Sequence, residues 1–173
     1  MYHPVDETAQ AVGVASQTVR NWISSGFLQI PCYTGLTKHD VITVMIAAEL
    51  SNLGIGPKLF EKIVPQVVHR VIKISIMLDA TWQNYYDLDF VEKQLQEATS
   101  PQCIHHIKDK INRERYCIIY YYKNDDGNAL KCIFVNNNML NDEKDTTRIM
   151  IDLLEFSRKA NRILAQLPII EKG

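Results

Sequence analysis

Residues 5–28 read VDETAQAVGVASQTVRNWISSGFL, and their spacing of small, apolar and turn-forming residues is typical of a helix-turn-helix. Ala9 is small enough to let two short helices cross closely. Gly13 can adopt the left-handed backbone conformation that a sharp turn requires. Three apolar residues are spaced to point into one small core, namely Val14, Val19 and Trp22. We expect Trp22 to be a core anchor rather than a base-stacking side chain, because it shares a helical face with Val19.

Two residues in this stretch are expected to cap the helices. Asp6 and Ser16 are of the types that accept hydrogen bonds from free N–H groups at a helix start. If Ser16 caps the second helix, the first exposed turn carries polar side chains at the place where a recognition helix meets base edges and phosphates: Gln17, Thr18, Arg20 and Asn21. The local pattern therefore predicts a helix that reads DNA.

The run Thr18-Val19-Arg20-Asn21-Trp22, followed by Gly26 and Leu28, resembles the recognition helix of the MerR family of regulators. It is also similar to that of excisionase-like phage proteins. The resemblance covers roughly the first 65 to 70 residues and implies a winged helix-turn-helix that binds DNA as a dimer. The implied wing is residues 29–36, which contain Pro31, Tyr33, Thr34 and Gly35.

Further elements follow in the order of that family. Thr37-Lys38-His39-Asp40 is a variant of the capping box and predicts the start of a helix that continues through residues 41–53. Gly54-Ile55-Gly56-Pro57 resembles the break before the family's fourth helix. We expect this fourth helix to begin at Pro57 and to kink or restart at Pro65.

The charge of the N-terminal segment is unusual for a DNA-binding surface. Residues 1–60 carry three basic side chains, Arg20, Lys38 and Lys58, against four acidic ones, Asp6, Glu7, Asp40 and Glu49. Phosphate binding normally uses a basic surface. DNA binding would then depend on a few placed donors, on helix N-terminal amides and on their doubling in a dimer.

Composition is that of a soluble, ordinary protein. The 173 residues, 46% hydrophobic, are enough for a sizeable core with a small appended module. Apolar runs stay shorter than about 18 residues and the N-terminus lacks the regions of a signal peptide, so we expect a cytoplasmic protein without membrane contact. The cysteines at positions 32, 103, 117 and 132 show no CxxC spacing, which favours reduced thiols.

The second half of the chain predicts an α+β module over residues 71–173, after a DNA-binding domain over residues 1–70. Residues 71–78 fit both a strand and a helix, and we prefer the strand. Residues 87–98 and 104–112 are expected helices. Two alternating segments, 116–122 and 130–135, flank Asn124-Asp125-Asp126-Gly127-Asn128, where Asp-Gly indicates a hairpin. Packing the hairpin with residues 71–78 would give a small antiparallel sheet with helices.

A long last helix is expected over residues 144–167. Its apolar residues follow a heptad seam: Ile149, Leu153, Phe156, Ala160, Ile163 and Leu167. The seam is short for a coiled coil, so dimerisation and packing against the chain's own sheet are equally good interpretations.

The second module offers little chemistry. Cys103-Ile104-His105-His106 lacks the partners of a metal set, and surface histidines beside a buried cysteine explain it better. Six tyrosines are candidates for an effector pocket, although ordinary strand composition explains them better: Tyr85, Tyr86, Tyr116, Tyr120, Tyr121 and Tyr122.

Catalytic motifs are not recognised, and neither an enzyme nor a cofactor is expected. Asp125 and Asp126 are explained by turn chemistry. Four basic residues are better explained by a solvated helix face than by phosphate contacts: Lys108, Lys110, Arg113 and Arg115.

These observations lead to one main hypothesis, a dimeric, sequence-specific transcription regulator bound to double-stranded DNA. Gln17 and Asn21 would read bases, while Thr18, Arg20 and Lys38 would position phosphates. Ser16, Tyr33 and Thr34 complete the predicted DNA-binding set. An architectural protein of phage or plasmid recombination or segregation, and a protein-interaction adaptor without DNA affinity, stay open as alternatives. An effector for the second module, a small molecule or a protein, also stays open.

Overall fold

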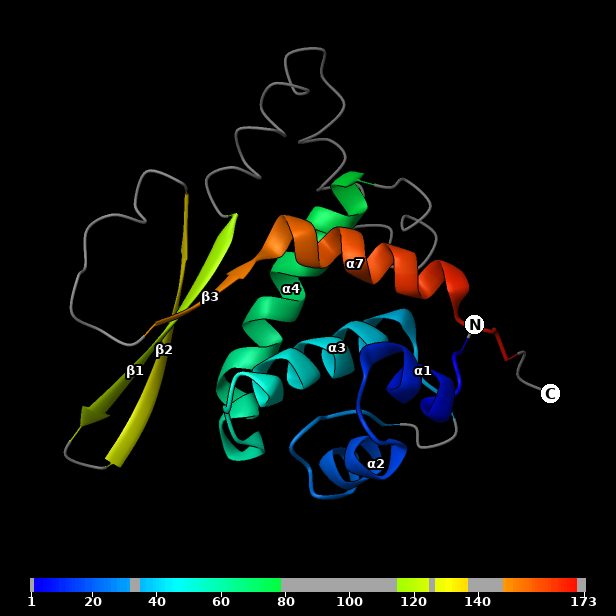
Figure 1. The fold of residues 1–173 in the computed structure, drawn as a ribbon, viewed down its shortest axis with the longest axis horizontal. Helices are drawn as coiled ribbons and strands as arrows, with labels where there is room; N and C mark the ends of the chain where they lie inside the picture. Colours follow the sequence, from blue (N-terminus) through cyan, green and yellow to red (C-terminus); the bar gives the residue numbers. More distant parts are fainter. Residues whose placement is uncertain (1, 32–34, 79–114, 125–126, 137–147, 171–173) are drawn as a thin grey trace, which may run out of the picture. The chain divides into compact units, whose positions relative to one another are not determined.

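The computed structural model describes residues 2–31, 35–78, 115–124, 127–136 and 148–170 (Figure 1). Within these residues the protein has five α-helices, a short 3-10 helix and a three-stranded antiparallel sheet, so the predicted α+β class is confirmed. Backbone contacts divide the chain into two units, Met1–His69 with Lys159–Gly173, and Arg70–Arg158. The first division lies beside the expected boundary at residue 70, and residues 159–173 group with the N-terminal unit. The helices expected over 87–98 and 104–112 lie outside the described residues.

The two short helices of the motif are present as α1 (Val5–Val12) and α2 (Ser16–Ser24). Gly13 follows α1 in the left-handed conformation, with φ at +78°, as its place in the turn predicts. The predicted N-caps are wrong. Pro4 and Ala15 occupy the cap positions in extended conformations without side-chain capping bonds. The carboxylate of Asp6 instead turns to the side chains of Arg20 and Ser16 on α2.

The centre of the first unit is α3 (Lys38–Asn52). The predicted capping box is confirmed, because the Asp40 amide donates to Thr37 Oγ1 at 3.2 Å and the Thr37 amide donates to Asp40 Oδ2 at 2.9 Å. Burial alone would raise the pKa of Asp40, but the hydrogen bonds from His39 and Thr37 outweigh it and hold that pKa below its ordinary value. The charged carboxylate that completes the box is therefore favoured.

Ten residues of α3 are buried, and they point in all directions around the helix axis. Figure 1 shows α3 between the α1–α2 pair and the C-terminal part of α7 (Leu153–Gln166), where Lys159 Nζ lies 3.5 Å from Glu49 Oε2. A helix that is apolar on every side has to be covered on every side. The surrounding elements of this unit supply that cover.

The fourth helix corrects two predictions, the restart at Pro65 and the strand over residues 71–78, whereas a kink at Pro65 stays a prediction. A 3-10 turn, η1 (Pro57–Leu59), precedes α4 (Phe60–Leu78), which continues through Pro65 without a restart. The strand predicted over residues 71–78 is wrong, because these residues are the last two turns of α4. Buried residues recur at helical spacing along it, as Val67, Val71 and Ile74 do. Burial of this face and the lack of a turn signal after Pro65 outweigh the alternating pattern.

The predicted hairpin is confirmed. β1 (Tyr116–Asn124) pairs antiparallel with β2 (Gly127–Val135), and Asn124 lies opposite Gly127. The third strand is β3 (Arg148–Asp152), which lies on the other side of β1 in the order β2-β1-β3. It takes the place expected for residues 71–78. Because β1 is central, both its edges are paired. Three successive residues of β1 are buried, Cys117, Ile118 and Ile119, so both faces of this part of the strand are covered.

The last helix is shorter than expected. Ile149 lies in β3, and α7 begins at Leu153 and has 14 residues. Four of the six seam residues are buried within the chain: Leu153, Phe156, Ala160 and Leu167. Ile163 is half-buried. This burial favours the interpretation that the seam packs within its own chain, while dimerisation stays a prediction.

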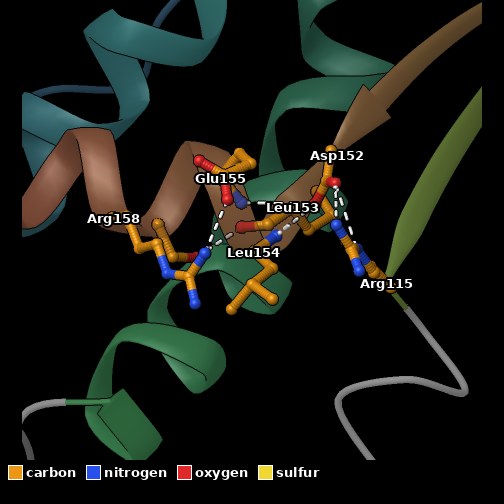
Figure 2. Close-up of polar contacts among 7 residues, drawn as sticks. Arg115, Asp152, Leu153, Leu154, Glu155 and Arg158 are labelled. Carbon is orange, nitrogen blue, oxygen red and sulfur yellow. Dashed lines mark hydrogen bonds and ion pairs between the residues drawn. The ribbon is translucent and has the colours of Figure 1, made fainter.

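Asp152 explains where β3 ends and α7 begins (Figure 2). Its Oδ1 atom accepts hydrogen bonds from the amides of Leu154 at 3.0 Å and Glu155 at 3.2 Å, which is the geometry of an N-cap. Its Oδ2 atom accepts from Arg115 Nε at 3.0 Å and Nη2 at 2.7 Å. One carboxylate thus fixes the helix start and binds the residue before β1.

The N-terminal residues are held by two isolated bridges. Tyr2 pairs with Ile170 and His3 pairs with Leu36. The buried His3 ring donates from Nδ1 to the Pro168 carbonyl at 3.0 Å, while its Nε2 has no hydrogen-bond partner among the described residues. Burial lowers the pKa of His3, and the positive charges of Lys38 and the N-terminus lower it further, whereas the bond to Pro168 opposes the shift. The neutral ring is favoured in the folded state.

We expect Asp152→Ala to lower the free energy of unfolding by about 1–3 kcal/mol, because it removes a helix cap and leaves the Arg115 guanidinium without its carboxylate acceptor. Asp152→Asn keeps an oxygen for the helix amides and should cost less. Urea unfolding followed by circular dichroism measures both, with Glu155→Gln as the control on the same turn. Equal stability of Asp152→Ala and Glu155→Gln would contradict this role for Asp152.

His3 should make stability depend on pH. Its pKa is lowered from 6.5 in the folded state, so the unfolded chain binds the proton first and stability falls as pH drops below that value. Urea unfolding between about pH 8 and about pH 5.5 should show a smaller loss for His3→Gln, whose neutral amide can still donate to Pro168. Parallel pH profiles for the two proteins would rule out His3 as the source.

Candidate nucleic-acid interface

The outer face of α2 carries the two predicted base-reading residues, Gln17 and Asn21, and the predicted phosphate contact, Arg20. Gln17, Arg20 and Asn21 are exposed at positions i, i+3 and i+4 of the helix. The opposite face is buried by Val19, Trp22 and Ile23. Trp22 is a core residue as predicted, 5% exposed, and its ring packs edge-to-face on Phe60 with centroids 5.4 Å apart. Anchoring of the apolar face therefore determines which side chains α2 presents to solvent.

Arg20 is paired with Asp6 across the two helices. Its Nη2 atom lies 2.8 Å from Asp6 Oδ1, and both side chains are exposed. Hydrogen bonds from Arg20 and from Ser16 lower the pKa of Asp6, so the carboxylate stays charged at neutral pH. Exposed ion pairs of this kind contribute little net stability. Arg20 can therefore exchange Asp6 for another anion at small cost.

Gln17 and Asn21 are bonded to each other. Gln17 Nε2 donates to Asn21 Oδ1 at 2.8 Å, one helical turn apart on the exposed face. The bond leaves the Gln17 carbonyl oxygen as an acceptor and the Asn21 amide nitrogen as a donor. Neighbouring acceptor and donor groups of this kind match the N6 and N7 edge of adenine in a major groove.

The other predicted DNA-binding residues have mixed positions. Ser16 and Thr18 are half-buried in the first turn of α2, where Ser16 donates to Asp6. Lys38 is the first residue of α3 and is also half-buried. Tyr33 and Thr34 lie outside the described residues. The structure thus brings Ser16 and Arg20 together on Asp6, and Gln17 together with Asn21.

The expected wing is described only at its ends. Residues 29–31, 35 and 36 are described, and among them Leu36 forms an antiparallel bridge with His3. That bridge joins the segment to the N-terminus, which the sequence pattern did not predict. A hairpin within residues 29–36 therefore stays a prediction.

Candidate sites in the second module are mostly outside the described residues. This holds for Cys103, His105 and His106, and for Tyr85, Tyr86, Asp125, Asp126, Lys108, Lys110 and Arg113. Tyr116 is half-buried, with the Arg115 guanidinium 5.1 Å from its ring centroid. In the described part of the chain, no group of three or more histidine, cysteine or acidic side chains could hold a metal ion. An effector pocket therefore stays a prediction.

Asp6 is the residue of this candidate interface whose contact the sequence did not predict. It was assigned to a cap because an acidic residue near a helix start fits that role equally well. The only signal for its contact with Arg20 is the opposite charge of two residues on helices joined by a short turn. Opposite charges on two helices predict a contact only when the way in which the helices pack is known.

Comparison with known proteins adds no further evidence, since no protein-family model, curated protein or solved structure matches this chain. Among the described helices, none is both long and apolar enough to cross a membrane. The assignment of a function therefore depends on the geometry of the α1–α2 pair.

Proposed function

We propose that the protein is a sequence-specific DNA-binding transcription regulator that inserts α2 into the major groove. The observation that supports this most is the exposed face of α2, where Gln17, Arg20 and Asn21 lie together while Val19 and Trp22 hold the opposite face in the core. A recognition helix needs such a division between anchored and presented side chains. The left-handed turn at Gly13 and the resemblance to MerR-like winged helix-turn-helix domains agree with it.

The roles of the residues follow from their chemistry. Arg20 exchanges the Asp6 carboxylate for a DNA phosphate and so positions the helix. Gln17 and Asn21 read a base edge with the acceptor and donor that their mutual bond leaves unused. Ser16 and Thr18 lie at the N-terminus of α2, where free backbone amides favour a phosphate.

Additional contacts come from elsewhere in the first unit. Lys38 adds a phosphate contact from the start of α3. Tyr33 and Thr34 add contacts from the wing that the family resemblance implies. Each is a weaker part of the proposal than α2, because Lys38 belongs to another helix and Tyr33 and Thr34 lie outside the described residues.

A dimer is part of the proposal. One α2 helix with one paired arginine supplies few contacts, and two helices spaced by about 34 Å would double them on successive turns of the groove. The C-terminal seam is one candidate interface. The buried residues of this seam would have to become accessible before they could form a dimer interface. A different surface of the chain can equally form that interface.

The pairing of Arg20 with Asp6 also favours a second function. A helix-turn-helix whose arginine is compensated, on a segment with four acidic and three basic side chains in residues 1–60, suits an adaptor that binds protein. This adaptor would bind its partner in the absence of DNA and would show no salt-dependent affinity for duplex DNA.

The first test is selection of the purified protein against a random duplex library, followed by affinity measurements on the enriched site at two salt concentrations. Arg20→Ala should weaken binding to all sequences and reduce the salt slope by about 1. Asn21→Ala should relax the preference at one base pair, by about 1–3 kcal/mol.

Unchanged affinity in both variants would exclude α2 as the reading helix, and no enrichment at low salt would favour the adaptor. Bent DNA without a response from promoters would indicate the architectural alternative.

A second test uses the acidic residues of α1. Asp6→Asn releases Arg20 for phosphate, so we expect tighter binding and a steeper salt dependence. Glu7→Gln is the matched control, because it removes the same charge from the neighbouring exposed position of α1. A larger gain for Asp6→Asn than for Glu7→Gln supports the exchange at Arg20. Equal gains would show a general charge effect and contradict that exchange.

A further inference from the structure

Two cysteines face each other across the β1–β2 hairpin. Cys117 lies opposite Phe134, and Cys132 lies opposite Ile119, so the cysteines are diagonal neighbours on one face of the sheet. Both are free thiols, with their sulfur atoms 2.8 Å apart. The covalent S–S bond of a disulfide is about 2.05 Å long. The pairing of β1 with β2 thus brings together two thiols that are 15 residues apart in the sequence.

The two thiols differ in environment. Cys117 is fully buried, and both its hydrogen bond to Cys132 and its burial raise its pKa. Cys132 is half-buried. The hydrogen bond between the two thiols lowers the pKa of Cys132, burial opposes this shift, and the charge of Arg70 lowers the pKa further. Cys132 is therefore the better nucleophile and the more accessible one.

Arg70 belongs to the same unit as the hairpin. Its guanidinium carbon lies 4.8 Å from the centroid of the Phe134 ring, and Phe134 is on the same sheet face as the cysteines. Strand register and this stacking together place a fixed cation on that face. A cation beside a thiol favours its reaction with disulfides.

We propose that Cys117 and Cys132 are a thiol-oxidation site, which forms a reversible intramolecular disulfide by exchange with a low-molecular-weight disulfide such as glutathione disulfide. This site is independent of the proposed DNA-binding function. It also goes beyond the expectation from cysteine spacing, which predicts reduced thiols.

The exchange proceeds in two steps. The Cys132 thiolate attacks one sulfur of glutathione disulfide, forms a mixed disulfide and releases one glutathione thiolate. Cys117 then attacks the Cys132 sulfur, the bond between Cys132 and glutathione breaks, and the Cys117–Cys132 bond forms. The thiol proton of Cys117 passes to the departing second glutathione. The protein loses two electrons and two thiol protons in total, and glutathione disulfide is reduced to two glutathione molecules.

The test begins with the full chain in its reduced form, incubated with glutathione disulfide under folding conditions. Peptide mapping by mass spectrometry should identify a Cys117–Cys132 linkage, together with loss of both free thiols and recovery of both after dithiothreitol. Failure of the linkage to form in the folded chain, or glutathione on both cysteines without a linkage, would overturn the proposal.

Single variants then separate the two roles. Cys117→Ser should accumulate the mixed disulfide at Cys132, because no resolving thiol is left. Cys132→Ser should leave Cys117 unmodified as long as circular dichroism shows the native fold. Equal modification of both variants would contradict Cys132 as the attacking thiol.

The role of Arg70 is tested by the rate of the first step against pH. Arg70→Gln should move the profile to higher pH, because Cys132 loses the charge that favours its thiolate. Arg158→Gln is the matched control, since Arg158 is exposed and paired with Glu155 in the same unit. The profile of this control should coincide with that of the unsubstituted chain. Coincident profiles for all three proteins would overturn the assignment of Arg70.

Discussion

Burial of α3 is the constraint on which the first unit depends. Ten of its residues are buried, and its first turn is completed by a reciprocal cap between Thr37 and Asp40. The elements that cover such a helix must turn their own apolar faces inward. In the same unit α2 buries Val19 and Trp22, with the Trp22 ring on Phe60 at the start of α4, and leaves its polar face in solvent: Gln17, Arg20 and Asn21. Packing of the core therefore accounts for which side chains of α2 are exposed at the candidate interface.

The elements predicted correctly from sequence are those determined by local chemistry. A glycine in a sharp turn, a reciprocal capping box and an Asp-Gly turn between alternating segments each act within a few residues. The N-caps assigned to Asp6 and Ser16 are the exception, because the contact between Asp6 and Arg20 depends on the packing of two helices. The errors between helix and strand occur at residues 71–78 and 148–152. There the outcome depends on distant partners: α4 continues because its face is buried, and β3 forms because β1 offers an open edge. Asp152 then ends the strand by capping α7. This cap was not predicted from the sequence, because the heptad spacing of Ile149 and Leu153 predicted one uninterrupted helix.

The candidate site was predictable to a similar extent. Helical periodicity alone indicated which residues of α2 would be exposed. The ion pair of Asp6 with Arg20 was not predictable, because it depends on how two helices cross and because Asp6 fits a local cap equally well. The cysteine pair was missed for a related reason. Spacing rules for cysteines consider neighbours in sequence, whereas Cys117 and Cys132 meet through strand register.

The pairing of Arg20 has a consequence for how a regulator of this kind would discriminate DNA sequences. Non-specific affinity arises almost entirely from cations that neutralise phosphates. In this chain the cation of α2 is already neutralised by Asp6, so its transfer to a phosphate gains only the difference between two ion pairs. Base contacts from Gln17 and Asn21 would then supply a larger share of the binding free energy. The proposed regulator would bind random DNA weakly and would depend on two correct half-sites for its affinity.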